Sequence, residues 1–235
     1  MTRSGKGPGA VFFDLYGTLL NLGRLDAECE AIAPGRGAEV AAAWRSEQLR
    51  LTWLRTIAGA WADFEVVTAD ALASTGQRFG LAPALLDQVA GTFDRLPPRA
   101  GAEPVLRGLR EAGLVLGILS NGSEAMIERA LDGSGLRNVF DHVLSVDSVR
   151  RYKPDPAVYQ LAVDATGLAP ASIAFVTAND WDAAGAAAFG FDVAWLQVPG
   201  SKLAPRLGGR SPRSVNWADV GHIGSARSDT APTQG

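Results

Sequence analysis

The chain has 235 residues, 47% of them hydrophobic and 20% charged, so it can bury a sizeable core and is not disordered by composition. Its 22 basic and 25 acidic residues give a net charge of −3, which argues against nucleic-acid binding, because that binding depends on basic charge. A single cysteine, Cys29, excludes an internal disulfide and favours a reducing compartment. No apolar run reaches the ~18 residues of a membrane span and no signal peptide is evident, so we expect a cytoplasmic protein without membrane partners.

The first predicted strand covers residues 10–13 and ends at Asp14. The next 80 or so residues lack any alternation of strands and helices, and they are predicted to be helical. Apolar side chains between Val40 and Trp61 recur every three or four residues, and further helices are predicted over 67–79 and 83–93. Pro97-Pro98 marks the end of this region. We interpret residues 21–99 as a helical cap domain inserted after the first strand.

Helices and strands alternate in the second half of the chain. Short apolar runs predict strands over 114–119, 142–146, 173–176 and 191–196, and their lack of polar alternation is typical of strands buried on both faces. Helices are predicted over 104–112, 123–131, 156–166 and 181–189, with Ser123 as an N-cap and Pro156 in a first turn. This order predicts an α/β fold with a doubly wound, mostly parallel sheet.

The last part of the chain, residues 208–235, is rich in Gly, Ser, Arg and Pro and has one weak apolar cluster at Val215–Trp217. We expect a surface extension that is partly disordered. The predicted organisation is therefore a core domain formed by residues 1–20 and 100–207, the cap of residues 21–99, and this C-terminal extension.

Polar residues follow several of the predicted strands. Asp14 ends the first strand, Ser120 and Asn121 end the second, and Thr177, Asn179 and Asp180 follow the fourth. Ligands of doubly wound sheets bind at the carboxyl ends of the strands, so we expect these side chains to meet. A carboxylate that is partly desolvated and held against an electrophile can act as a nucleophile, which makes Asp14 a candidate catalytic residue. The alternative for Asp14 is a loop-capping role.

Several stretches together resemble one enzyme superfamily. They are Phe13-Asp-Leu-Tyr-Gly-Thr-Leu19, Trp44-Arg45 with Leu51-Thr-Trp-Leu-Arg55, Leu119-Ser-Asn-Gly-Ser123, Tyr152-Lys-Pro-Asp-Pro156 with Val158-Tyr159, and Asn179 with Trp181-Asp182 and Phe189-Gly-Phe191. Between residues 10 and 197 the chain resembles the haloacid dehalogenase (HAD) superfamily, and within it the L-2-haloacid (type II) dehalogenases. The resemblance implies a HAD-like Rossmannoid core and a homodimer.

Tyr16 separates two branches of this superfamily. Phosphatases of this superfamily carry the pattern Asp-x-Asp at the first motif. Their second Asp protonates the leaving oxygen near a magnesium ion. Here that position is Tyr16, and a phenol with a pKa near 10 is a poor acid at neutral pH. A halide leaves without a proton, so Tyr16 is compatible with carbon–halogen displacement and unfavourable for phosphate-ester hydrolysis. We therefore expect a dehalogenase without cofactor or metal, acting on a small 2-haloacid.

The resemblance also implies roles for individual residues. Asp14 displaces halide from C2 and forms an ester, while Lys153 and Asp182 position or activate the water that hydrolyses it. The implied catalytic residues are Asp14, Thr18, Arg45, Ser120, Lys153, Tyr159, Thr177, Asn179 and Asp182. The implied substrate-binding residues are Leu15, Tyr16, Ser46, Leu49, Phe64, Asn121 and Trp181. Among them, Ser120 and nearby backbone N–H groups bind the substrate carboxylate, and Arg45 with Asn121 binds the halide.

Some positions leave other interpretations open. Ser46 and the pair Thr177-Ala178 depart from the family pattern of Gln and a Ser pair, which affects the expected rate and substrate range. Arg45 could be a solvated surface charge, and Phe64 and Leu49 could be plain core residues, as we expect for Trp53 and Trp61. A HAD phosphatase, a non-catalytic binding protein and a dehalogenase-like enzyme with another substrate are the competing functions.

Overall fold

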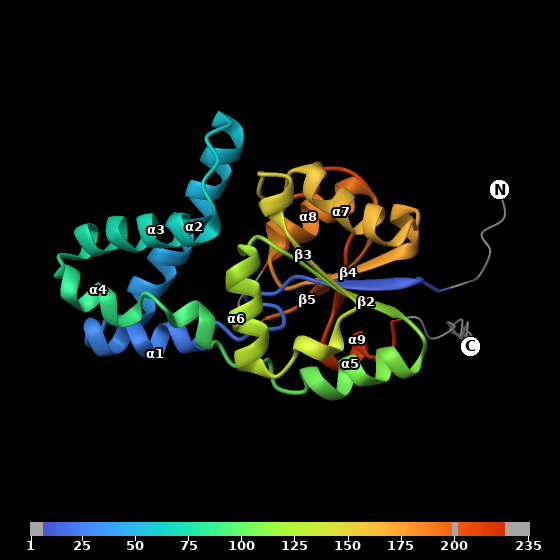
Figure 1. The fold of residues 1–235 in the computed structure, drawn as a ribbon, viewed down its shortest axis with the longest axis horizontal. Helices are drawn as coiled ribbons and strands as arrows, with labels where there is room; N and C mark the ends of the chain where they lie inside the picture. The colour runs from blue at the N-terminus through green and yellow to red at the C-terminus, as the bar shows by residue number, and fades with distance from the viewer. Residues whose placement is uncertain (1–6, 199–201, 224–235) are drawn as a thin grey trace, which may run out of the picture.

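The computed structural model describes residues 7–198 and 202–223 and contains a six-stranded sheet with the order β3-β2-β1-β4-β5-β6 (Figure 1). The strands are β1 (Ala10–Phe13), β2 (Val115–Ser120), β3 (His142–Ser145), β4 (Ile173–Thr177), β5 (Asp192–Leu196) and β6 (Arg213–Val215). Each pair of neighbouring strands is parallel, and Ala10 of β1 lies opposite both Val115 and Ile173. The predicted α/β, doubly wound fold is confirmed.

Helices cover both faces of the sheet. The helices α5 (Ala102–Glu111), α6 (Glu124–Ser134) and α9 (Trp217–Val220) lie on one side, and α7 (Pro156–Thr166) and α8 (Asp180–Phe189) lie on the other (Figure 1). Short 3-10 helices occur at Arg137–Val139, Val146–Ser148 and Pro170–Ser172. All residues of β1 are fully buried, which explains why its sequence is a continuous apolar run without alternation.

A separate group of helices follows β1. It consists of α1 (Gly23–Ile32), α2 (Gly37–Ala58), α3 (Phe64–Phe79), α4 (Pro83–Val89) and the 3-10 helix η1 (Thr92–Arg95), which lie to the left of the sheet in Figure 1. Helix α3 begins at Phe64 rather than at the predicted Val67, because the Asp63 carboxylate accepts a hydrogen bond from the Val66 N–H (2.9 Å) and caps it. The predicted helix over 83–93 is divided between α4 and η1.

The structure differs from the predicted C-terminal surface extension. Strand β6 extends the sheet beside β5, and α9 packs against α5. Val215, Val220 and Ile223 are buried, and the Trp217 ring centroid lies 6.5 Å from that of Phe13. A three-residue strand is too short to produce a periodic pattern, so its place in the sheet depends on tertiary contacts. The expected disorder beyond residue 223 lies outside the described residues.

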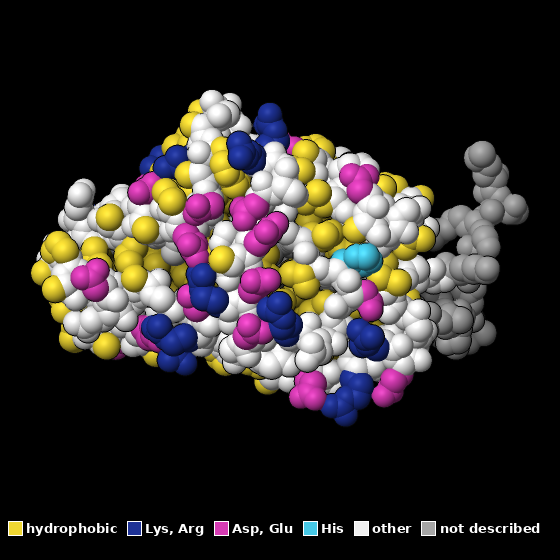
Figure 2. Space-filling model, in the orientation of Figure 1, with side chains coloured by type: hydrophobic (Ala, Val, Ile, Leu, Met, Phe, Trp, Pro, Cys, Tyr) yellow, Lys and Arg dark blue, Asp and Glu magenta, His cyan; other side chains and the backbone are white. Residues whose placement is uncertain are grey.

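Contacts between side chains and backbone hold the cap helices against the core. The Tyr152 hydroxyl donates to the Ala62 carbonyl (2.7 Å), and Arg129 of α6 pairs with Glu65 of α3 and Asp94 of η1. Acidic and basic side chains lie interspersed on the face seen in Figure 2. Within the described ranges, no helix has the length and apolar character needed to cross a bilayer.

Candidate active site

Asp14 lies where the central strand β1 ends. Its backbone N–H continues the pairing with β4 by donating to the Val176 carbonyl (3.0 Å), and its side chain is 7% exposed. Gly17 then adopts a φ of +87°, a backbone conformation that favours glycine, in the turn that leads to Thr18. The Asp14 Oδ2 atom accepts hydrogen bonds from the Thr18 hydroxyl (2.9 Å) and the Asn179 amide (2.8 Å). The carboxylate is thus held in one orientation at the sheet edge.

A fully buried lysine connects this carboxylate to a second one. The Lys153 Nζ atom lies 3.1 Å from Asp14 Oδ1 and 3.0 Å from Asp182 Oδ2. Burial acts to lower the pKa of Lys153, but the carboxylates of Asp14 and Asp182 outweigh it, so the pKa is raised overall. Lys153 therefore stays protonated between two negative charges, at a position where an unpaired ammonium would be strongly destabilising.

Asp182 occupies the first turn of α8 and is fully buried. Its Oδ1 atom accepts a hydrogen bond from the Tyr159 hydroxyl (2.8 Å), which lies on α7. Burial raises the pKa of Asp182 to about 6, although the Lys153 ammonium acts in the opposite direction. A carboxylate with this pKa is ionised at neutral pH and is a better proton acceptor than an ordinary aspartate.

Small residues let α8 approach the loop that carries Lys153. A Cβ atom on Gly185 would lie 2.4 Å from Pro154 Cβ and 2.7 Å from the Tyr159 hydroxyl, so only glycine fits there. Ala183, Ala184, Ala186 and Ala187 are buried on the same helix. This alanine-rich run is visible in the sequence, but its role in bringing Asp182 to Lys153 was not predicted.

Other residues at the strand ends fix the loops around this cluster. The Ser120 hydroxyl accepts from the Gly122 N–H (3.1 Å), and the Thr177 hydroxyl accepts from the Asn179 N–H (3.1 Å). The Asn121 Oδ1 atom accepts from the Lys153 N–H (3.0 Å), which joins the loop after β2 to the lysine loop. Ser120, Asn121 and Thr177 are buried at this edge, as is Leu15 beside Asp14.

Arg45 comes from helix α2 of the cap. Burial lowers the pKa of its guanidinium, while the Asp14 carboxylate and Tyr16 act to raise it. The group remains a cation, because the pKa of arginine starts far above neutral. Its Nη1 atom donates a hydrogen bond to the Gln48 Oε1 atom. Gln48 is fully buried and was not predicted as a site residue.

Aromatic rings form the apolar part of the site. Tyr16 stacks on Phe64 with ring centroids 6.1 Å apart, and Phe93 meets it edge-on at 5.5 Å. Burial raises the pKa of the Tyr16 phenol further above its usual value, so the group is neutral and cannot serve as an acid at pH 7. Trp181 meets Trp53 edge-on at 5.9 Å, so Trp53, predicted for the core, lies half-buried beside a predicted site residue.

Two predicted pocket residues on α2 differ in placement. Leu49 is half-buried, one helical turn beyond Arg45. Ser46 is exposed, and within the described part of the chain no hydrogen bond links it to the other site residues. One residue along an α-helix turns the side chain by about 100°, so Ser46 points away from the face that carries Arg45. The contact of Ser46 with substrate stays a prediction.

The side chains around Asp14 do not suit the binding of a divalent cation. Both carboxylates of the cluster contact the Lys153 ammonium, which would repel a metal ion, and Tyr16 replaces the carboxylate of the phosphatase motif. In the ranges 7–198 and 202–223, no group of three or more His, Cys, Asp or Glu side chains could hold a metal.

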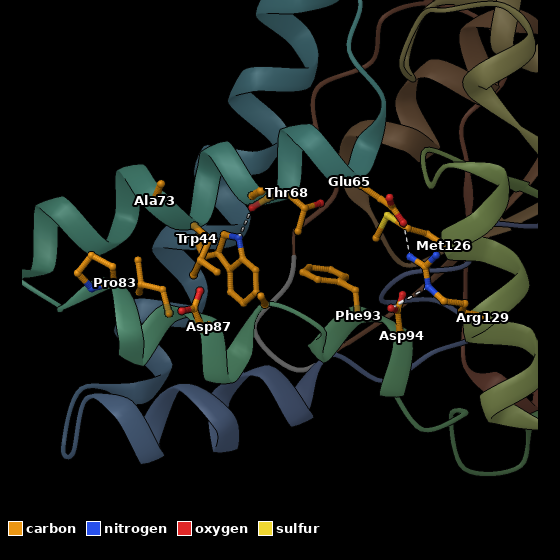
Figure 3. A pocket seen from close by; sticks show the side chains of 14 residues that line it. Trp44, Glu65, Thr68, Ala73, Pro83, Asp87, Phe93, Asp94, Met126 and Arg129 are labelled. Atoms are coloured by element: carbon orange, nitrogen blue, oxygen red, sulfur yellow. Dashed lines mark hydrogen bonds and ion pairs between the residues drawn. The ribbon is translucent and has the colours of Figure 1, made fainter.

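A cavity of about 400 Å³ lies elsewhere, between α3, α4 and α6 (Figure 3). Trp44, Thr68, Phe93, Met126 and Arg129 are among its lining residues, and none of the predicted site residues lines it. It is therefore distinct from the Asp14 cluster, although Trp44 and Thr68 belong to the helices that carry Arg45 and Phe64.

The chain matches the family of haloacid dehalogenase-like hydrolases over residues 8–190. It is 42% identical to an (S)-2-haloacid dehalogenase of Pseudomonas sp. strain YL, over 81% of this chain and 83% of that protein. It is 40% identical to haloacetate dehalogenase H-2 of Moraxella sp. strain B, over 80% of this chain and 84% of that one.

A solved structure supports the same relationship. The L-2-haloacid dehalogenase of Xanthobacter autotrophicus with covalently bound chloropropionic acid is 40% identical and superposes with a TM-score of 0.76. The alignment covers 80% of this chain and 77% of that one. The resemblance noted from the sequence motifs is thereby confirmed. The chain belongs to the haloacid dehalogenase-like hydrolases, and within them to the group of the (S)-2-haloacid dehalogenases.

Proposed function

We propose that this protein hydrolyses short-chain L-2-haloalkanoic acids to D-2-hydroxy acids through an ester on Asp14. The observation that carries the proposal is the nucleophile arrangement: a nearly buried carboxylate oriented by Thr18, Asn179 and Lys153, next to a neutral phenol at Tyr16. The names of the relatives, and the covalently bound chloropropionic acid in one of them, support the same reaction.

In the first half-reaction, Asp14 attacks C2 from the side opposite the halogen. A carbon–oxygen bond forms while the carbon–halogen bond breaks, and the electron pair of the broken bond leaves with the halide. The configuration at C2 inverts, which converts the L-substrate into a D-ester. No proton is needed for halide departure, so the neutral Tyr16 does not impede the step.

The loops at the strand ends offer hydroxyl and backbone N–H donors that suit a substrate carboxylate. We assign this role to the Ser120 hydroxyl and to the backbone N–H groups of Leu15, Tyr16 and Asn121. Arg45 and the Asn121 amide receive the departing halide. Phe64, Leu49 and Trp181 form the apolar wall, which strengthens charge interactions by excluding water.

In the second half-reaction, water attacks the carbonyl carbon of the Asp14 ester. Asp182 accepts a proton from that water, and Lys153 stabilises the negative charge that develops on the Asp14 oxygen. The bond between the acyl carbon and the substrate oxygen then breaks, Asp182 returns its proton to that oxygen, and the hydroxy acid leaves while Asp14 becomes a carboxylate again. Tyr159 holds Asp182 in place through their 2.8 Å hydrogen bond. Hydrogen bonds made by Thr18, Asn179 and Thr177 fix the Asp14 loop relative to the loop after β4.

The experiment that tests the function measures halide release from L- and D-2-chloropropionate in the presence of EDTA. We expect the L-isomer to be consumed, the product to be D-lactate, and the rate to be unaffected by chelation. The control is hydrolysis of a phosphate monoester with and without magnesium under the same conditions. Phosphate release that requires magnesium, without any halide release, would favour the HAD-phosphatase alternative.

The pKa of Asp182 predicts how the second half-reaction depends on pH. Because this pKa is raised to about 6, Asp182 takes up a proton as the pH falls through that value and can no longer accept one from water. In the ester Asp14 carries no charge, and that charge helps to raise the pKa of Asp182, so the acid limb of ester hydrolysis should lie below pH 6 and fall by up to about tenfold for each pH unit. Single-turnover decay of the ester, followed from about pH 4 to pH 8, checks this. A rate that is constant across that range would exclude Asp182 as the base.

We further propose that the enzyme works as a cytoplasmic homodimer. The resemblance to the L-2-haloacid dehalogenases implies the dimer, and the single, buried Cys29 is compatible with a reducing compartment. Light scattering of the purified protein would test the assembly state.

A further inference from the structure

We propose that Gln48 is a positioning residue for halide departure, because its amide holds the Arg45 guanidinium in place through a neutral acceptor. The positive charge of Arg45 then stays available to the halide. This inference rests on the proposed function, which assigns halide binding to Arg45, and it adds a residue that does not itself touch the substrate.

The hydrogen bonds around Gln48 determine how its amide is oriented. Its Nε2 atom lies 2.6 Å from the Thr68 Oγ1 atom, and the Thr68 hydroxyl donates its only hydrogen to the Phe64 carbonyl (2.5 Å). Thr68 can therefore only accept from Gln48, which requires the amide nitrogen to face Thr68. The amide oxygen must then face Arg45, where it accepts from Nη1.

The same turn of α3 also fixes the helix that carries Arg45. The Trp44 indole N–H donates to the Thr68 carbonyl (3.0 Å), and Figure 3 shows the Trp44 ring pointing toward Thr68. Two positions of α2, on either side of Arg45 in sequence, are thus attached to Thr68. Phe64, which stacks on Tyr16, lies one turn earlier on α3. The guanidinium and the apolar wall consequently share one rigid support.

The neutrality of Gln48 matters because of the charges in the site. Before reaction, the cations Lys153 and Arg45 balance the anions Asp14 and Asp182. Esterification removes the charge of Asp14, so the two cations then face the carboxylates of Asp182 and of the bound substrate, and the negative charge that Asp14 loses appears on the departing halide. In the described part of the chain, Arg45 forms no salt bridge with an acidic side chain. A carboxylate at position 48 would supply such a counter-ion and compete with the halide.

The test uses Gln48→Met, which keeps the length and removes the hydrogen bonds, and Gln48→Glu, which keeps an acceptor and adds a charge. Gln77→Met is the matched control, because Gln77 is exposed on α3. We expect Gln48→Met to slow ester formation from L-2-chloropropionate by about ten- to a hundredfold, with ester hydrolysis unchanged. The loss should be smaller with the bromo substrate, because bromide needs less stabilisation when it leaves. Gln48→Glu should weaken bromide binding, measured calorimetrically, more than Gln48→Met does.

A double-mutant cycle separates positioning from a general packing role. If Gln48 acts through Arg45, Gln48→Met should have almost no further effect on ester formation in an Arg45→Ala background. Equal losses in both backgrounds, or equal losses for chloro and bromo substrates, would overturn the inference even if the variant is less stable. A rate of ester formation in Gln48→Met that equals the rate in Gln77→Met would also overturn the inference.

The wild-type reactions distinguish this outcome from a failure of the proposed function. Wild-type protein that releases no halide and binds no bromide overturns the proposed function, and the role of Gln48 with it. Wild-type protein that releases halide, together with unaffected Gln48 variants, overturns only the role of Gln48.

Discussion

A single turnover of L-2-chloropropionate in heavy-oxygen water is expected to place the label on Asp14 and not on the released hydroxy acid. The product oxygen then originates from the Asp14 carboxylate, because water attacks the carbonyl carbon of the ester rather than C2. Mass spectrometry of the peptide that contains Phe12 to Leu20 checks this. Replacing the nucleophile in Asp14→Asn should reduce turnover by on the order of 10⁴-fold or more.

A companion variant allows the intermediate to be observed directly. Asp182→Asn removes the proton acceptor for water but is close in shape to aspartate, so we expect the ester to accumulate and the Asp14 peptide to gain the acyl mass. Label that appears at once in the product, with no adduct in Asp182→Asn, would contradict nucleophilic attack by Asp14. It would indicate instead that Asp14 activates water as a general base.

Replacing Lys153 is expected to affect both activity and stability. Lys153→Met removes the cation that lies 3.1 Å from Asp14 and 3.0 Å from Asp182 and leaves two buried carboxylates without their partner. Breaking a buried ion pair in this way costs about 3–5 kcal/mol in the free energy of unfolding. Without the ammonium, the pKa of the Asp182 carboxyl should rise further, and Asp14 loses the group that holds its Oδ1 atom. We expect kcat to fall by roughly 10³-fold or more.

Urea denaturation and rapid-quench measurement of ester formation check the two parts of this prediction. Lys202→Met is the control, because Lys202 is exposed and lies outside the site. The acid limb of residual ester hydrolysis should move to higher pH, because Asp182 loses the Lys153 charge that lowers its pKa. A variant with wild-type stability and ester formation would mean that Lys153 neither balances nor orients the two carboxylates.

The sequence by itself predicted five of the six described strands, the polar edge of the sheet, and the dehalogenase branch rather than the phosphatase branch. Buried strands with helices on both sides are continuous apolar runs, so β1, β2 and β4 and the residues at their ends could be located from local pattern. Asp14 and Thr18 are close in sequence and contact each other in the same turn. The exchange of an acid for Tyr16 is visible in one motif and required no coordinates.

Other features depended on contacts between residues that are far apart in the chain. Gln48 is one of several glutamines in the sequence, and only its burial between Arg45 and Thr68 distinguishes it. The exposure of Ser46 depends on how α2 packs against α3, which a motif match does not determine. The burial of Val215 follows from the pairing of β6 with β5. In each case tertiary packing decides whether the side chain is buried or exposed, and the local sequence contains no periodic pattern that indicates the outcome.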